Sequence, residues 1–197
     1  MSATAKSGPA APGARPSGQG AESPAGSARR SAARLAAVQA LYQIELTGGT
    51  PETVLQEFLD HRFGEDLEGL SLGQADQALF GDLLRGVALE AEPLDDMLSA
   101  VLAEGWPVER LETLLRIILR AGAYELAFRP EIPARVTITQ YVNLAQAFFE
   151  GREPGMANGV LDRLAHSLRP EEFAGDLPEV GRDREDGAEP PAESGSG

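Results

Sequence analysis

The sequence predicts an all-α protein of about seven helices, and three observations support this. Apolar residues recur at spacings of three and four over most of residues 29–170, which is the helical period. Glycine and proline interrupt the pattern at intervals of about one helix length. No stretch alternates apolar and polar residues in the manner of a half-buried strand. Since the expected loops are short, consecutive helices should run antiparallel.

The chain is expected to hold one folded segment between two disordered tails. Residues 1–28 are mostly Ala, Gly, Pro and Ser, and residues 171–197 are rich in Glu, Asp, Gly and Pro. Neither segment has enough large apolar side chains to offset the entropy lost on ordering. We therefore expect a single compact domain over residues 29–170.

Cap and break signals place the first three helices. The first is expected to follow Arg29 and to stop at Gly48-Gly49. Thr50-Pro51 supplies an N-cap residue and a proline suited to the first helical position, which predicts a second helix. Ser71 and Gln74 have the spacing of a capping box, which predicts the start of a third.

Four further helices are predicted in the second half. Pro93 marks a break before a short helix, and residues 108–128 are apolar on nearly every face, as expected of a helix surrounded by others. Thr137 and Gln140 form a second capping-box pattern, and residues 156–168 predict the last helix.

Composition argues against several classes of protein. The chain has no Cys and only two His, so disulfides, thiolate chemistry and a zinc site are not expected. No apolar run approaches a membrane span or a secretory signal, and a cytoplasmic location is expected. Adjacent acids such as Asp95-Asp96 diverge by about 100° on a helix and do not share a site. With no phosphate-binding loop or nucleophile motif, we expect neither an enzyme nor a cofactor.

The formal net charge of −14 seems unsuited to a nucleic-acid partner. By segment, residues 1–28 carry +1, residues 29–170 carry −8 and residues 171–197 carry −7. Half of the negative charge therefore lies in a tail that is expected to be solvated. Basic residues clustered on a mildly acidic domain remain compatible with RNA.

Arg29, Arg30 and Arg34 are the strongest candidates for RNA contacts. Arg30 and Arg34 are four residues apart and share a helix face, and guanidinium groups bind phosphate bidentately. The alternative is a solvated helix end. Gln39 and Tyr42 lie further along the same helix, where the tyrosine either stacks on a base or packs in the core.

Four segments, in order and over residues 29–168, resemble the NusB family of bacterial antitermination factors. The matching strings are Arg34–Tyr42 with its Val-Gln-Ala-Leu-Tyr run, Leu119–Leu126 with Leu-Arg and Tyr-Glu-Leu, Pro133–Ala145, and Asn158–Asp162, which reads Asn-Gly-Val-Leu-Asp. The resemblance implies two small helical subdomains packed as one domain.

The resemblance also implies partners and an RNA path. The expected partners are the small-subunit ribosomal protein that acts as NusE, boxA-type single-stranded RNA, and the antitermination complex of RNA polymerase on ribosomal RNA operons. Arg30 and Arg34 would contact phosphates. Tyr42, Phe148 and the loop into Met156–Asn158 would line the RNA, and Arg152 would add positive charge there. The basic ribosomal partner is expected on an acidic face of the middle helices.

The sequence departs from the family pattern at several positions. Ser31 and Ala32 stand where further basic residues are common, and Gly155 and Met156 replace a usual Lys-Phe pair. Two other functions therefore stay open: a protein–protein scaffold with little RNA binding, and the detached RNA-binding domain of an RNA cytosine methyltransferase. Whether the free protein is a monomer or a homodimer also stays open.

Overall fold

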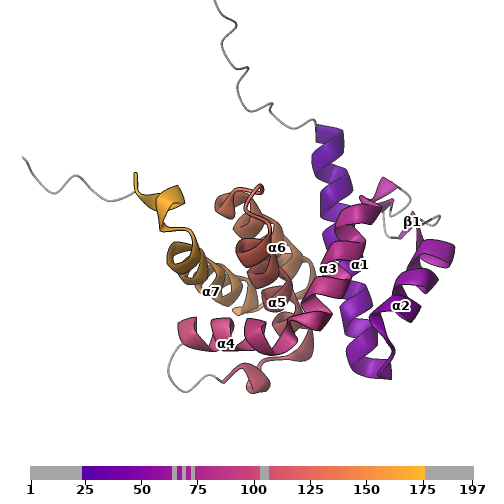
Figure 1. The fold of residues 1–197 in the computed structure, drawn as a ribbon, viewed down its shortest axis with the longest axis horizontal. Coiled ribbons are helices and arrows are strands. Elements are labelled where there is room, and N and C mark those ends of the chain that lie inside the picture. The colour runs from indigo at the N-terminus through magenta and orange to yellow at the C-terminus, as the bar shows by residue number, and fades with distance from the viewer. Residues whose placement is uncertain (1–23, 64–65, 68–69, 72–73, 103–106, 176–197) are drawn as a thin grey trace, which may run out of the picture.

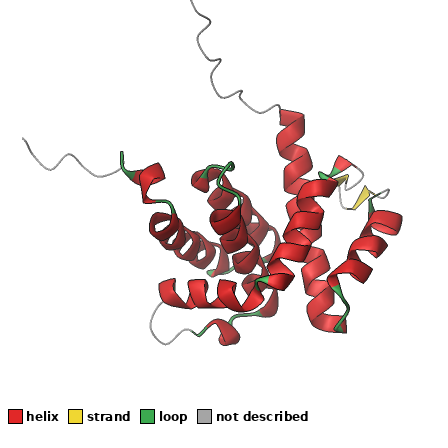
Figure 2. Cartoon of the chain, viewed as in Figure 1, coloured by secondary structure: helices red, strands yellow, loops and turns green. Residues whose placement is uncertain are grey.

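A computed structural model describes residues 24–63, 66–67, 70–71, 74–102 and 107–175. Within these ranges it contains seven α-helices, which confirms the predicted all-α class (Figures 1 and 2). Their bounds are α1 Pro24–Thr47, α2 Pro51–Glu57, α3 Gln77–Leu89, α4 Ala91–Val101, α5 Thr113–Phe128, α6 Ala134–Phe148 and α7 Glu153–Leu168.

Shorter elements join them. A π-helical turn η1 (Phe58–Arg62) continues α2, and 3-10 turns η3 (Val108–Arg110) and η4 (Pro170–Phe173) precede α5 and follow α7. Two-residue strands β1 (Asp66–Leu67) and β2 (Leu70–Ser71) form a small antiparallel pair. Such short strands leave no alternation in the sequence, which is why they were not expected.

The helices form two groups that meet along α5. Helices α1, α2 and α3 pack against one another, while α4, α5, α6 and α7 form the second group (Figure 1). Helix α5 also contacts α1 and α3. Ten of its residues, from Leu115 to Leu126, are buried, which confirms the prediction that this helix is surrounded by others. No helix in the described ranges meets the length and hydropathy needed to span a bilayer.

Several of the expected helix starts are wrong. Helix α4 begins at Ala91 and contains Pro93, α5 begins at Thr113 rather than at residue 108, and α7 begins at Glu153 rather than at Met156.

The starts of α3 and α6 also differ. Helix α3 begins at Gln77, where Asp76 is the N-cap and its Oδ1 accepts the N–H of Leu79 at 3.1 Å; Ser71 lies in β2. Helix α6 begins after Pro133, one turn before the expected Thr137, which is buried within the helix. In both places a neighbouring residue with equally good cap chemistry or a fixed φ starts the helix.

The folded segment extends beyond residues 29–170 at both ends. Helix α1 begins at Pro24, a residue type favoured at a first helical position, and the small residues after it propagate a helix that packing of the following turns has nucleated. At the other end Phe173 is buried, with its ring 4.0 Å from the ring of His166. The remaining tail residues, 1–23 and 176–197, lie outside the described ranges.

Close approach between the helices depends on small residues. In α1 five alanines are buried: Ala32, Ala33, Ala36, Ala37 and Ala40. In α3 a Cβ at Gly86 would lie only 2.1 Å from the ring of Tyr124 on α5. A larger residue at Gly86 would therefore push α3 away from α5.

One buried ion pair connects the two groups of helices. The Arg34 guanidinium on α1 donates from Nε to both oxygens of Glu125 on α5, at 2.8 and 3.1 Å, and from Nη2 to Oε2 at 3.0 Å. The exposed fractions of the two side chains are 3% and 0%. The fully buried Tyr141 of α6 lies beside the pair, and burial raises the pKa of its phenol, with the charge of Glu125 adding to the effect.

A second buried arginine terminates α5. The guanidinium of Arg169 donates to the backbone carbonyls of Glu125, Leu126, Arg129 and Ile132, at 2.6 to 3.0 Å. The last carbonyls of a helix have no intrahelical donor, and here a side chain from beyond α7 supplies one. The end of α5, the link to α6 and the end of α7 are thereby tied together.

We predict that the protein loses stability at alkaline pH because of Tyr141. A free tyrosine titrates near pH 10, whereas the buried phenol keeps its proton to higher pH. Above pH 10 the unfolded chain therefore binds one proton fewer than the folded chain, and the free energy of unfolding should fall by about 1.4 kcal/mol per pH unit. Urea unfolding of the wild type and of Tyr141→Phe is measured at several pH values between 9 and 11. Above pH 10 the free energy of unfolding of the variant should fall with pH less steeply than that of the wild type, by that amount. An equally steep fall in both proteins would contradict the assignment.

Candidate nucleic-acid interface

The structure removes Arg34 from the expected RNA-contacting set. Its side chain is buried, and its guanidinium donates hydrogen bonds to both carboxylate oxygens of Glu125. It faces α5 because Arg34, Val38 and Leu41 form a helical stripe directed at that helix. A phosphate could reach this guanidinium only by displacing Glu125 from the interior.

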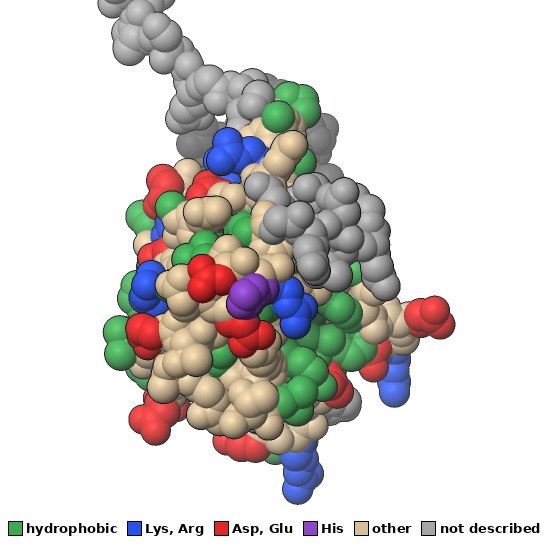
Figure 3. All heavy atoms as spheres, turned by 90° about the vertical axis from the view of Figure 1, so that its right-hand side faces the viewer, with side chains coloured by type: hydrophobic (Ala, Val, Ile, Leu, Met, Phe, Trp, Pro, Cys, Tyr) green, Lys and Arg blue, Asp and Glu red, His purple; other side chains and the backbone are tan. Residues whose placement is uncertain are grey.

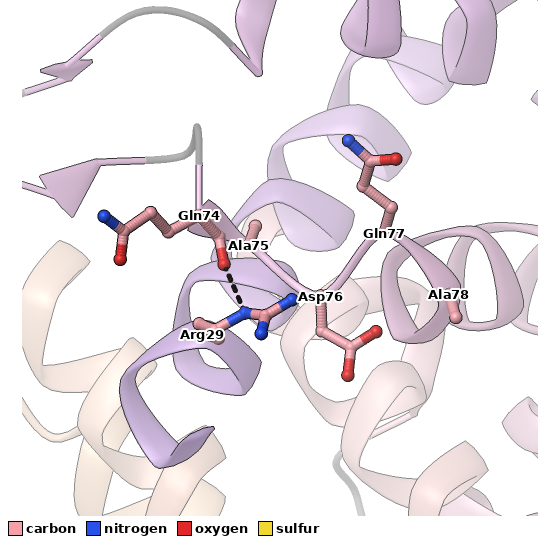
Figure 4. A pocket seen from close by; sticks show the side chains of 6 residues that line it. All are labelled: Arg29, Gln74, Ala75, Asp76, Gln77 and Ala78. Atoms are coloured by element: carbon pink, nitrogen blue, oxygen red, sulfur yellow. Dashed lines mark hydrogen bonds between the residues drawn. The ribbon is translucent and has the colours of Figure 1, made fainter. Parts of the chain in front are cut away.

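Arg29 is exposed but engaged. Its Nε donates to the backbone carbonyl of Gln74 at 2.9 Å, and its own carbonyl accepts the N–H of Asp76 at 3.1 Å (Figure 4). These bonds fix the segment before α3 against α1, and Arg29 lines a shallow hollow with residues 74–78.

Arg30 lies on an open groove of mixed charge. The acidic residues that line the groove with it are Asp76, Asp82, Glu131 and Glu172, and the second basic residue is Arg129. A hydrogen bond from Arg129 to Glu131, at 2.5 Å, lowers the pKa of that carboxyl and keeps it charged. The arginine cluster expected from the sequence is therefore dispersed over a buried pair, a loop contact and an acidic groove.

The face that carries α2 shows no continuous basic patch among the described residues. Acidic and basic side chains alternate over it (Figure 3). Arg85, for example, lies 3.7 Å from the carboxylate of Glu52, and both side chains are largely exposed. Such interspersed charges are typical of a solvated surface.

Gln39 and Tyr42 occupy the middle of α1 and are half-buried. Tyr42 packs against the hydrophobic core along part of its side chain. The Oε1 atom of Gln39 is buried without a hydrogen-bond partner. Of the two alternatives for Tyr42, core packing is observed, and base stacking by the exposed part of its side chain stays a prediction.

The remaining expected residues gather at the end of α6 and the start of α7. Phe148 is 40% exposed at the last position of α6, and Arg152 is exposed in the loop that follows. Met156 is half-buried and Asn158 is exposed, both on α7. This group lies apart from Arg30. Ser31, next to Arg30, hydrogen-bonds Gln140, which precedes Phe148 by about two turns of α6.

Sequence reasoning missed Arg110 on η3. Arg110 lines a hollow with Arg152 and Met156, together with Leu111 and Leu115. The two arginines come from segments about 40 positions apart, so no spacing rule relates them. Only the position of both arginines outside the apolar helical stripes of the sequence could have indicated that they remain exposed.

Comparisons with known proteins agree with the fold and the segments. Residues 31–166 match the model of the NusB family. The transcription antitermination protein NusB of Rhodopseudomonas palustris (strain BisB18) is 47% identical over 146 residues, covering 74% of this chain and 86% of the relative. That of Caulobacter vibrioides is 49% identical over 140 residues, covering 71% and 94%.

Solved structures show the same fold. NusB of T. maritima has a TM-score of 0.55 at 29% identity and covers 74% of this chain and 96% of its own. A crystal structure of antitermination factors NusB and NusE in complex with dsRNA has a TM-score of 0.57 at 22% identity, covering 70% and 96%. The helical fold and the segments at α1, α5 and α7 thus define a protein of the antitermination-factor class.

The chain belongs to the NusB family. Its curated relatives are transcription antitermination proteins, which agrees with the expectation of a factor rather than an enzyme.

We predict that Arg34 is needed for stability. Arg34→Ala leaves Glu125 buried and unpaired and should cost about 3–5 kcal/mol in chemical unfolding followed by circular dichroism. Replacing both partners with apolar residues, Arg34→Met with Glu125→Leu, should recover most of that loss. Arg85→Ala, which removes an exposed pair, is the control and should cost under about 1 kcal/mol. A loss equally small for Arg34→Ala would show that the pair is not buried as described.

Proposed function

We propose that this protein binds boxA-type single-stranded RNA together with the ribosomal protein acting as NusE. The pair then supports processive transcription of ribosomal RNA operons, in the cytoplasm, as part of an antitermination complex of RNA polymerase. The observation that carries the proposal is the exposed group at the α6–α7 junction, in the part of the chain that matches the family. A protein of the same fold has been crystallised with NusE and RNA, which supports the choice of partners.

The proposed RNA path follows the exposed residues and leaves out Arg34. Phe148, Arg152, Met156 and Asn158 form its main contact region. Arg30 is about 18 Å from Tyr42 along the axis of α1, at 1.5 Å per residue. Contacts at both Arg30 and Tyr42 therefore require a strand that runs along the helix, with Gln39 between them and Arg29 beyond the far end.

The basic ribosomal partner is expected on the acidic side of the middle helices. Glu92 and Asp96, four residues apart, are both exposed on α4 and form this acidic side. Complementary charge favours encounter with a basic protein and disfavours binding of RNA at those positions. RNA and protein would then occupy neighbouring but distinct surfaces.

A protein–protein scaffold with little RNA binding is the second candidate. The dispersion of Arg29, Arg30 and Arg34 and the net charge of −8 over residues 29–170 favour it. The methyltransferase alternative has less support, because the chain covers 86% and 94% of relatives that are themselves NusB proteins. A homodimer remains a proposal for solution measurements.

We predict that the chain and its ribosomal partner together bind boxA-type RNA more tightly than a scrambled RNA of equal length. Arg152→Ala should weaken both RNAs, because a phosphate contact is independent of sequence, and should reduce the log–log salt slope by about 0.7 on single strands. Fluorescence anisotropy titrations at several salt concentrations measure both quantities.

Arg85→Ala removes the same charge on a different face and should leave both affinities and the slope unchanged. Equal binding of boxA-type and scrambled RNA by the wild-type pair would refute the antitermination proposal. Undetectable binding to either RNA, with partner binding intact, would favour the scaffold.

A further inference from the structure

A hollow of about 310 Å³ lies between η3, the start of α5 and the start of α7. Its apolar wall is formed by Leu111 and Leu115, whose exposed fractions are 6% and 3%, together with the half-buried Met156. Its volume is at the lower end of the range for small-molecule sites, which is about 300–1,000 Å³. The hollow therefore has room for one small group, such as a single base.

The two arginines at this hollow differ from the other arginines in the described part of the chain. Arg110 and Arg152 are exposed, and neither guanidinium makes a hydrogen bond, ion pair or ring contact with another described residue; only their backbone groups are hydrogen-bonded. Elsewhere arginine side chains have partners, as Arg120 does with Asp95 and Arg163 with the carbonyl of Val101. Two guanidinium groups on one hollow, both without a partner among the described residues, are unusual in a protein of this acidity.

The carboxylates at the hollow do not neutralise these arginines. Glu112 caps α5, and its Oε2 accepts the N–H of Leu115 at 3.0 Å. Glu153 lies over Gly151, where an added Cβ would be 2.5 Å from its Oε2. Within the described residues neither carboxylate forms an ion pair with Arg110 or Arg152, so the guanidinium groups remain available to an anion.

We propose that this hollow receives one base of the bound single-stranded RNA, with Arg110 and Arg152 holding the phosphates on either side. The flat face of a base packs against apolar side chains, and arginine binds phosphate in a planar fork. The inference rests on the proposed RNA-binding function and adds Arg110, Leu111 and Leu115 to the site. It extends the main RNA contact region at the α6–α7 junction to η3 and the start of α5.

The first test compares Arg110→Gln with Arg85→Gln in the full chain with its ribosomal partner and boxA-type RNA. Arg85 is a matched control, since it is an exposed arginine whose single carboxylate neighbour is itself exposed. Arg110→Gln should lower RNA affinity about tenfold and reduce the log–log salt slope by about 0.7, and the double variant Arg110→Gln/Arg152→Gln should reduce it by about 1.4. Arg85→Gln should do neither. Thermal unfolding of each variant confirms that the fold is kept.

The second test locates the base. A series of RNAs, each lacking one base, is titrated against the wild-type chain and against Met156→Ala. One position should show a loss of at least fivefold in the wild type. Because Met156→Ala removes part of the stacking wall, the loss at that position should become clearly smaller, while losses at other positions stay the same.

The outcomes separate the inference from the function on which it rests. If the wild-type pair does not prefer boxA-type RNA, the proposed function fails before any variant is made. If it does, and Arg110→Gln behaves like Arg85→Gln, the function stands and the hollow is not on the RNA path. If no position in the base series depends on Met156, the hollow does not hold a base. If Arg110→Gln instead weakens binding of the ribosomal partner without RNA, the hollow takes an acidic segment of protein, and the inference is wrong.

Discussion

The ion pair between Arg34 and Glu125 is the constraint on which the arrangement of the two helix groups depends. Burying both charges is costly, and only a bidentate geometry with every atom satisfied offsets the cost. That requirement fixes the rotation and the height of α1 relative to α5. Arg169 adds to this at the same, C-terminal end of α5, where its guanidinium donates to the backbone carbonyls of Glu125 and Leu126. Helix α5 is thus held by one arginine from the N-terminal half and one from the C-terminal end.

This constraint explains why the arginines of α1 do not form a phosphate-binding cluster. Along α1, Arg34 meets Glu125 and Glu45 meets Arg116 and Arg120, so the two helices run antiparallel with their charges in register. One turn before Arg34, the same stripe passes the end of α5 and reaches the groove where Arg30 and Arg129 lie. The stripe is therefore structural for most of its length, and only its first turn remains at the surface.

Most of the fold could be predicted from local patterns, because helix periodicity, the Thr50 cap and the Gly48 stop act within a few residues. Thr50 Oγ1 accepts the N–H of Thr53, and Gly48 has a φ of +69° that favours glycine. The starts at Asp76 and Pro133 could not be predicted, since several good caps were available within one turn. The placement of Arg34 could not be read from its spacing to Arg30, because that spacing shows which residues share a face but not what the face meets. A single clue was available: Arg34 shares its stripe with Val38 and Leu41.

The same reasoning explains how an acidic domain can still hold RNA. Salt screens the interaction between exposed charges within about 10 Å. A bound strand therefore responds mainly to the charged groups beside it and not to the net charge of the whole domain. What matters at a surface is which cations lack a carboxylate partner, and in this protein the partners are unevenly distributed. Arginines at the helix junctions around α5 are neutralised by Glu45, Asp82, Asp95 and Glu125, whereas those at η3 and before α7 have no carboxylate partner among the residues that the structure describes. The pairing of charges in the fold, rather than their number in the sequence, therefore determines where an anionic strand can bind.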